Sequence, residues 1–271
     1  MRKGNWITRG TIIGFALFAV GCSGQSGSSG PSGKAETTKP AAAGTVETSS
    51  GAGGYQVVSV ENAGQVTGVI RFGGDPPARK SIEVTKDREV CGKVDHLSEE
   101  LIVSSDKGLA NVVVSLTDIR QGKAMTAKAG GIRLDQKNCV FVPHVLVAPA
   151  GQSIDIYNND GILHNIHTFS EENRPFNKAQ PKFLKMINVE FSEPETIRVI
   201  CDAHGWMSAW IVVADNPYFA VTDENGRFRL GEVPPGTYSL KFWHEKLGEG
   251  TGTVTVTAGQ ESSVEHIFPA G

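Results

Sequence analysis

The chain has 271 residues, with 26 Lys or Arg against 29 Asp or Glu, so its formal net charge is -3. The basic residues are scattered and form no basic segment, which argues against nucleic acid as a partner. The length allows one large domain or two modest ones, and the apolar run near the N-terminus, residues 12–20, is too short to span a bilayer as a stable helix.

Residues 1–21 have the features of an export signal, with a basic start (residues 2–9) followed by the apolar run. Residues 19–22, Ala-Val-Gly-Cys, resemble a bacterial lipobox. In such a motif the cysteine is lipidated and becomes the new N-terminus, so Cys22 is the expected lipidation site. The alternative is an uncleaved membrane anchor.

Residues 22–54 comprise this cysteine and a tether of Gly, Ser, Ala, Thr and Pro, which has too few apolar residues to form a core and is expected to be disordered. A flexible linker of this length has a reach on the order of 30 Å. Ser23 resembles the outer-membrane sorting residue of Gram-negative lipoproteins. We therefore expect a lipid-anchored protein of the cell envelope. In a Gram-negative organism it would lie on the periplasmic side of the outer membrane.

After the tether, Val and Ile recur in short alternating runs bounded by Gly, Pro and Asp, without sustained helical periodicity. This pattern predicts an all-β protein of the sandwich kind. The first domain is expected to span residues 55–215. Its expected strands are 65–72, 82–85, 110–116, 140–148, 153–158, 195–200 and 209–214. Residues 169–188 lack a strand pattern and are expected to be irregular and to pack beside the functional site.

A second unit is expected over residues 216–271. Residues 219–230 predict a hairpin around an Asn-Gly turn, and residues 237–242, 254–257 and 264–268 predict further strands. About 55 residues are marginal for an independent core, so this unit should pack against the first domain.

The strongest chemical signal is Cys201-x-x-His204-x-x-Met207, which lies between two expected strands. A thiolate, imidazole nitrogens and one weak thioether form the donor set that selects copper and lets it change oxidation state. His164, 37 residues before Cys201, follows a strand-like run and completes the set. The amide of the next residue, Asn165, can tie one ligand loop to the other.

The other histidines are expected to have structural roles. His167 is three residues after His164 in an expected strand, so its side chain should point to the opposite face. His144 opens a strand that could end near the metal, and is not expected to bind it. His244 and His266 have no partner pattern.

Two other kinds of metal site use some of the same ligand types. Zinc also binds Cys and His, but it favours a stronger fourth ligand than a thioether. A binuclear copper centre needs a second cysteine in the same loop, and this loop contains only Cys201. The prediction is therefore one mononuclear copper site.

The remaining cysteines are Cys91 and Cys139, once Cys22 is assigned to lipid and Cys201 to metal. Export places them in an oxidising compartment, so we predict that they form a disulfide. The alternatives are two buried free thiols, or a further metal ligand among them.

Cys-x-x-His-x-x-Met after a strand, with His-Asn-x-His upstream, resembles the amicyanin branch of the cupredoxins over roughly residues 140–214. The resemblance implies a plastocyanin-like Greek-key β-sandwich with one type 1 copper, and a ring edge of His204 that faces solvent through an apolar patch as the electron port. The implied ligands are His164, Cys201, His204 and Met207. Gly205 departs from the pattern, because amicyanin has a proline there. If its extra N–H points at the thiolate, it should shift the reduction potential.

The tail resembles the carboxypeptidase regulatory-like module, a small transthyretin-like β-sandwich, through residues 223–228 and 234–238. That module has no protease activity. The resemblance implies a structural or binding role, with carbohydrate or protein as the ligand.

These observations favour an exported, lipid-anchored, mononuclear copper protein that carries single electrons between redox protein partners. No base, nucleophile or open substrate position accompanies the ligands, so we do not expect an enzyme. The main alternative is an envelope scaffold lipoprotein that binds glycan or protein through its tail, with little or no redox role. Two further alternatives are an oxidase or reductase subunit and a copper storage or delivery protein.

Overall fold

The computed structural model describes residues 54–126 and 130–270. The predicted signal segment 1–21, the lipidation site Cys22 and the linker 22–54, apart from Gly54, lie outside these residues. No helix in the described ranges is both long and apolar enough to cross a membrane.

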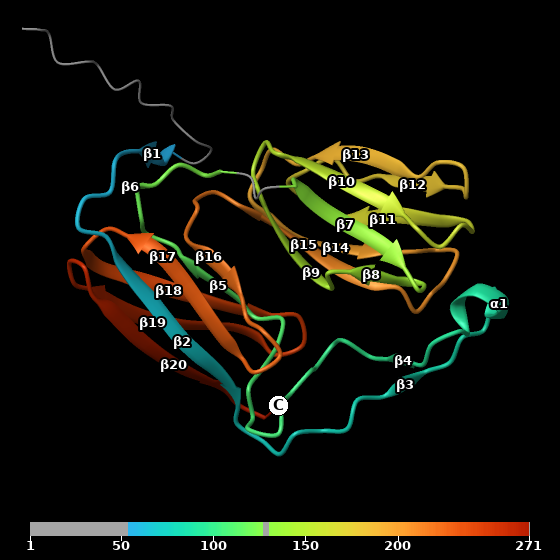
Figure 1. The fold of residues 1–271 in the computed structure, drawn as a ribbon, viewed down its shortest axis with the longest axis horizontal. Helices are drawn as coiled ribbons and strands as arrows, with labels where there is room; N and C mark the ends of the chain where they lie inside the picture. Colours follow the sequence, from blue (N-terminus) through green and yellow to red (C-terminus); the bar gives the residue numbers. More distant parts are fainter. Residues whose placement is uncertain (1–53, 127–129, 271) are drawn as a thin grey trace, which may run out of the picture. The chain divides into compact units, whose positions relative to one another are not determined.

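The described chain consists almost entirely of β-structure. It contains twenty strands and one four-residue helix, α1 (Arg88–Cys91). The strands form two sandwiches and two small strand pairs (Figure 1). The predicted all-β class is confirmed, because short alternating apolar runs suit strands with one buried face.

The first sandwich packs a sheet of order β13-β10-β7-β8 against one of order β12-β11-β14-β15-β9. Its strands are β7 (Ile132–Lys137), β8 (Val140–Val142), β9 (Val145–Pro149), β10 (Ser153–Asn158), β11 (His164–Phe169), β12 (Asn177–Gln180), β13 (Met186–Glu190), β14 (Glu195–Ile200) and β15 (Ser208–Ala214). Buried side chains alternate along the strands, as in β15. Ile154, Ile166 and Ile211 lie in the core between the sheets and are fully buried.

Residues 169–188 were expected to be irregular, and this expectation was wrong. They include β12, which pairs with β11, and the first residues of β13, which pairs with β10. Both are edge strands that are mostly exposed. β12 buries only Gln180, a polar residue, so its sequence lacks the apolar alternation that marks a strand. Only the start of β13, Met186–Asn188, falls in this range, which is too short a piece to show a period.

The second sandwich packs a sheet of order β16-β5-β18-β19 against one of order β17-β2-β20. Its strands are β2 (Gly64–Phe72), β5 (Val113–Leu116), β16 (Phe219–Val221), β17 (Arg227–Val233), β18 (Gly236–His244), β19 (Gly248–Val256) and β20 (Glu261–Phe268). Its core includes Ile70, Val114 and Phe242. Two further strands, β1 (Gln56–Val57) and β6 (Gln121–Gly122), pair in parallel.

The predicted hairpin over residues 219–230 is not present. The tight turn itself forms, with Gly226 N–H donating to Asp223 O at 2.9 Å. However, β16 pairs with β5 and β17 pairs with β2, so the turn connects opposite sheets. An Asn-Gly pair specifies a sharp reversal, but the sheet in which each flanking strand pairs depends on distant strands.

Strand pairing does not follow the expected division at residue 215. β2 and β5 come from residues 55–215, and they pair with strands of residues 216–271. Strand β2 runs parallel to β20 over eight residue pairs, from Gln65 with Glu261 to Phe72 with Phe268. The tail strands therefore share their core with a segment that precedes the first sandwich.

Between β2 and β5 lies a segment that we call the strap, residues 81–97. Its ends, β3 (Ser81–Ile82) and β4 (His96–Leu97), pair in antiparallel fashion, and α1 lies between them (Figure 1). A disulfide joins Cys91 of the strap to Cys139, between β7 and β8. The strap is thus covalently attached to the first sandwich.

Candidate metal centre

The predicted ligands lie at the ends of neighbouring strands in one sheet of the first sandwich. His164 is the first residue of β11, and Cys201 directly follows β14. Residues 201–207 form a tight loop before β15. Within it, the N–H of Cys201 donates to Met207 O at 3.2 Å, and the N–H of Met207 donates to His204 O at 2.9 Å. Paired strands thus hold the loop at both ends.

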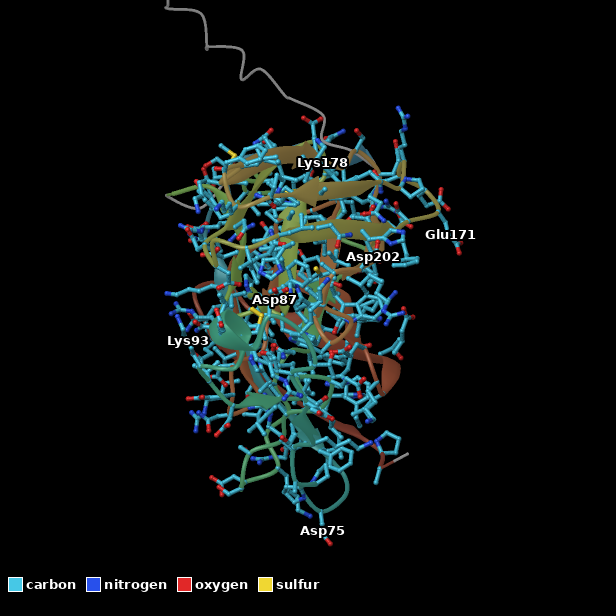
Figure 2. The ribbon with its side chains drawn as sticks, turned by 90° about the vertical axis from the view of Figure 1, so that its right-hand side faces the viewer. Asp75, Asp87, Lys93, Glu171, Lys178 and Asp202 are labelled. Atoms are coloured by element: carbon cyan, nitrogen blue, oxygen red, sulfur yellow. A yellow bond between two sulfur atoms is a disulfide. The ribbon has the colours of Figure 1, made fainter. Side chains whose placement is uncertain are left out.

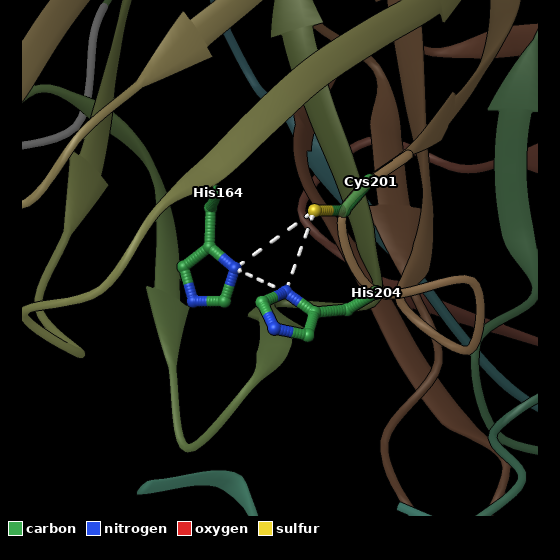
Figure 3. Close-up of side chains that lie close together, drawn as sticks. All are labelled: His164, Cys201 and His204. Carbon is green, nitrogen blue, oxygen red and sulfur yellow. Dashed lines mark hydrogen bonds between the residues drawn. The ribbon is translucent and has the colours of Figure 1, made fainter. Parts of the chain in front are cut away.

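The structure brings His164, Cys201 and His204 together as a triangle of donor atoms (Figure 3). The Nδ1 atoms of His164 and His204 are 3.0 Å apart, and each lies 3.8 Å from Sγ of Cys201. The exposed fractions of these residues are 0%, 0% and 1% for His164, Cys201 and His204. Two nitrogens and one sulfur therefore converge in a place closed to water.

Each imidazole is bound at its far side by a carboxylate. Nε2 of His164 lies 2.8 Å from Oδ2 of Asp160, and Nε2 of His204 lies 2.8 Å from Oδ2 of Asp87. An ionised carboxylate only accepts hydrogen bonds, which assigns the N–H to Nε2 in both rings. Both Nδ1 atoms then direct lone pairs at each other, an arrangement that requires a proton or a metal cation between them. The residues present therefore fit a bound metal ion.

The charges of the centre favour a thiolate. Burial raises the pKa of the Cys201 thiol, but hydrogen bonds from His164 and from the backbone N–H groups of Asn165 and His204 outweigh it, and the pKa is lowered overall. Burial lowers the pKa of His164, while Asp160 and Cys201 raise it to about 8. Because the thiolate is the form that binds metals, a cation can take the place of the proton.

Met207 closes the ligand loop and is 1% exposed. It belongs to the same buried cluster as Cys201 in the core of the first sandwich. A buried thioether excludes water from the centre and offers a soft sulfur donor. Its assignment as the fourth ligand stays a prediction.

Asn165 connects the two ligand segments. Its Oδ1 accepts a hydrogen bond from the N–H of Ala203 at 3.2 Å and lies 3.4 Å from Sγ of Cys201. Its Nδ2 donates to Asp202 at 3.1 Å. Gly205 is not a hydrogen-bond partner of Cys201 Sγ in the described part of the chain, so its effect on the thiolate stays a prediction.

The other two histidines near the ligand segments point elsewhere. His167 is partly exposed, and its Nδ1 lies 3.0 Å from Oδ1 of Asp202. His144 is buried and bonded through Nε2 to Glu245, which is in the turn between β18 and β19. Neither belongs to a group of convergent metal donors in the described ranges.

Cys91 and Cys139, the predicted disulfide pair, are joined in the structure. The sulfur of Cys139 is therefore engaged, although it lies near Asp160 and His164. The N–H of Cys139 donates to Oδ2 of Asp160 at 2.8 Å, and the N–H of Cys91 donates to the backbone oxygen of Asp87 at 2.9 Å. The disulfide thus links the strap, which carries Asp87, to the turn whose N–H groups hold Asp160.

The expectation that the ring edge of His204 faces solvent was wrong. His204 is 1% exposed, and its Nε2 contacts Asp87 of the strap. These residues are 117 positions apart and belong to segments that no motif connects. The resemblance concerned only residues 140–214, so it held no information about a covering segment from earlier in the chain.

Sequence reasoning also missed both carboxylates. Asp160 lies four residues before His164 in a turn, and this proximity was a usable signal. Asp87 had no signal, because a charged residue in a polar loop is usually solvated. Its role depends on the fold of the strap.

Residues 207–267 match the model of the carboxypeptidase regulatory-like domain. No curated protein matches the chain. Similar solved structures include an amicyanin variant in its Cu(I) form, with 20% identity and a TM-score of 0.29 over 33% of this chain and 90% of that chain. The purple cupredoxin from Nitrosopumilus maritimus is 18% identical, with a TM-score of 0.26 over 31% of this chain and 99% of that chain.

A copper-containing nitrite reductase from Thermus scotoductus SA-01 also matches, at 20% identity and a TM-score of 0.29, over 31% of this chain. The match spans only 22% of that reductase. The match at residues 207–267 is to the carboxypeptidase regulatory-like domain, the module that the tail motifs resemble. The similar solved structures include cupredoxins, the family that the ligand motifs resemble.

Proposed function

We propose that this protein binds one copper ion and carries single electrons between redox protein partners. The observation that carries this proposal is the buried triangle of two Nδ1 atoms and one Sγ. Two imidazoles and a thiolate, with a nearby thioether, form the donor set of electron-transfer copper sites. Copper bound by these donors would supply a one-electron couple.

The chain contributes rigidity and exclusion of water. Asp160 and Asp87 orient the two rings, and Asn165 ties the ligand loop to β11. Because the donors are buried and held from outside, they need little rearrangement when the charge of the centre changes. We do not assign a catalytic reaction, so the proposed role is transfer of electrons and not conversion of a substrate.

The test is to add Cu(II) to the purified body, residues 54–271, without the tether. We expect binding of one copper per chain and an intense visible absorption from thiolate-to-copper charge transfer, which disappears on reduction. Cys201→Ala should remove this absorption, while His167→Ala should retain it, because His167 points away from the donors. A colourless wild-type protein would contradict the proposal and favour the scaffold function.

A storage or delivery protein would give a different result in a second measurement. A redox centre should keep its copper against a moderate chelator in both oxidation states. Copper that leaves readily in either state would favour delivery. More than one copper per chain, with turnover of a small substrate, would favour an oxidase or reductase subunit.

We further propose that the protein is anchored in the cell envelope through lipid on Cys22. The support is the sequence of residues 19–22, together with the disulfide, which is typical of oxidising compartments. Labelled fatty acid should be incorporated into the full chain and not into Cys22→Ser. Soluble, unlabelled wild-type protein would contradict the anchor.

A further inference from the structure

Asp87 departs from the usual behaviour of an acidic residue at the start of a helix. It is the N-cap of α1, yet its side chain makes no capping hydrogen bond. Its backbone also adopts the left-handed conformation, with φ of 50°. A non-glycine residue in that region is strained, and an N-cap Asp normally accepts a hydrogen bond from the helix. Asp87 therefore has neither the usual backbone conformation nor the usual capping hydrogen bond of an N-cap residue.

The carboxylate instead contacts His204. Oδ2 of Asp87 lies 2.8 Å from Nε2 of His204, whose side chain is fully buried, while the side chain of Asp87 is 40% exposed. Asp87 therefore stands between the ring and solvent. Local rules that fail at one residue without a local benefit indicate a functional constraint.

Hydrogen bonds and the disulfide fix the part of the strap that carries Asp87. The N–H groups of Val90 and Cys91 both donate to the backbone oxygen of Asp87 at 2.9 Å. Cys91 is joined to Cys139, and its backbone oxygen is 2.8 Å from Nε2 of His96. Figure 2 shows Asp87 and Lys93 near α1, beside the yellow disulfide bond. The position of Asp87 is thus set by bonds on the strap and by a cross-link to the first sandwich.

We propose that Asp87 is a positioning residue for His204, an inference that rests on the proposed copper function. It holds the N–H on Nε2, so that Nδ1 faces His164 and Cys201, and it covers the ring edge. Its negative charge stabilises the more positive, oxidised state of a bound metal more than the reduced state.

Two variants separate charge from geometry. Asp87→Asn keeps the shape and removes the charge, whereas Asp87→Ala removes the contact. Glu89→Gln is the matched control, because it removes one negative charge from an exposed residue of the same helical turn. Circular dichroism first checks that each variant is folded.

The first measurement is the reduction potential of the copper-loaded proteins. We expect Asp87→Asn to reduce the preference for the oxidised ion about tenfold, which raises a one-electron potential by about 59 mV. Glu89→Gln should shift it far less, because its charge is exposed and screened. Equal shifts in both variants would overturn the proposal while leaving the copper function intact.

The second measurement needs no copper. Nitrogen NMR of the metal-free protein reports which ring nitrogen of His204 carries hydrogen. We expect the Nε2–H form in the wild type and in Glu89→Gln, and a mixture of forms in Asp87→Ala. If the wild type binds no copper but shows this contrast, the proposed function fails and the positioning role stands. An unchanged ring in Asp87→Ala would overturn the positioning role.

Discussion

Oδ2 of Asp160 lies 2.8 Å from Nε2 of His164, and the backbone N–H groups of Asn138 and Cys139 donate to the same carboxylate at 2.6 Å and 2.8 Å. Burial raises the pKa of Asp160, but the hydrogen bonds from His164 and the two N–H groups outweigh it, and the pKa is lowered overall. An ionised carboxylate is therefore fixed behind one predicted ligand before any metal binds.

Asp160→Asn should weaken copper binding by about 10- to 100-fold, because carboxylate partners of ligating histidines contribute about that much to metal affinity. Competition with a chelator of known affinity measures the effect. The matched control is Asp155→Asn on β10, whose carboxylate accepts a hydrogen bond from Asn188 at the surface. Equal affinity in both variants would show that the contact with His164 does not support binding.

Removal of the disulfide should destabilise the metal-free protein. Cys91 and Cys139 are 48 residues apart in sequence, and cross-linking a loop of that length stabilises a fold by about 4 kcal/mol in the chain-entropy model. The double variant Cys91→Ala with Cys139→Ala should lose about that much in urea unfolding. A loss below about 1 kcal/mol would show that the strap keeps its place without the cross-link.

The buried contact between His144 and Glu245 should make stability depend on pH. Burial lowers the pKa of His144, but the hydrogen bond and charge of Glu245 and the charge of Glu99 outweigh it, so the pKa is raised overall. A raised pKa means that the protonated ring stabilises the fold below the ordinary histidine value. That contribution is lost as the pH rises through the folded-state pKa.

His144→Gln should therefore lose more unfolding free energy at about pH 5.5 than at about pH 9, relative to the wild type at each pH. Trp210→Phe is the control. It removes the indole donor to Glu245 at 2.8 Å and no titrating group, so its cost should change little with pH. Equal losses at both pH values for His144→Gln would contradict the ion pair.

Gly205→Ala should be tolerated in the ligand loop. An added Cβ at Gly205 meets no atom within 4 Å, and the residue is not in the positive-φ region. A substitution of this kind stabilises by about 0.4–1 kcal/mol, because it restricts the unfolded chain. Thermal unfolding measures it, and a clear decrease in stability would mean that the loop needs glycine.

Much of the fold followed from local patterns. The runs that became β2, β10, β14 and β15 place buried residues mostly at every second position, so periodicity alone predicted them. Strand β12 escaped prediction because it buries almost no apolar surface. The partners of β16 and β17 escaped it because a turn signal carries no information about which distant strand will pair.

The sequence by itself determined the chemistry of the centre. Cys201, His204 and Met207 have the spacing of one loop, and His164 follows a strand, so the donor types could be read from the chain. Only the tertiary structure decided what surrounds them. Asp87 contacts His204, which lies 117 residues later in the chain, and the strap that carries Asp87 is cross-linked through Cys91 to the first sandwich. Residue type and spacing encode which atoms can bind a metal, whereas access and orientation depend on contacts between segments that folding brings together.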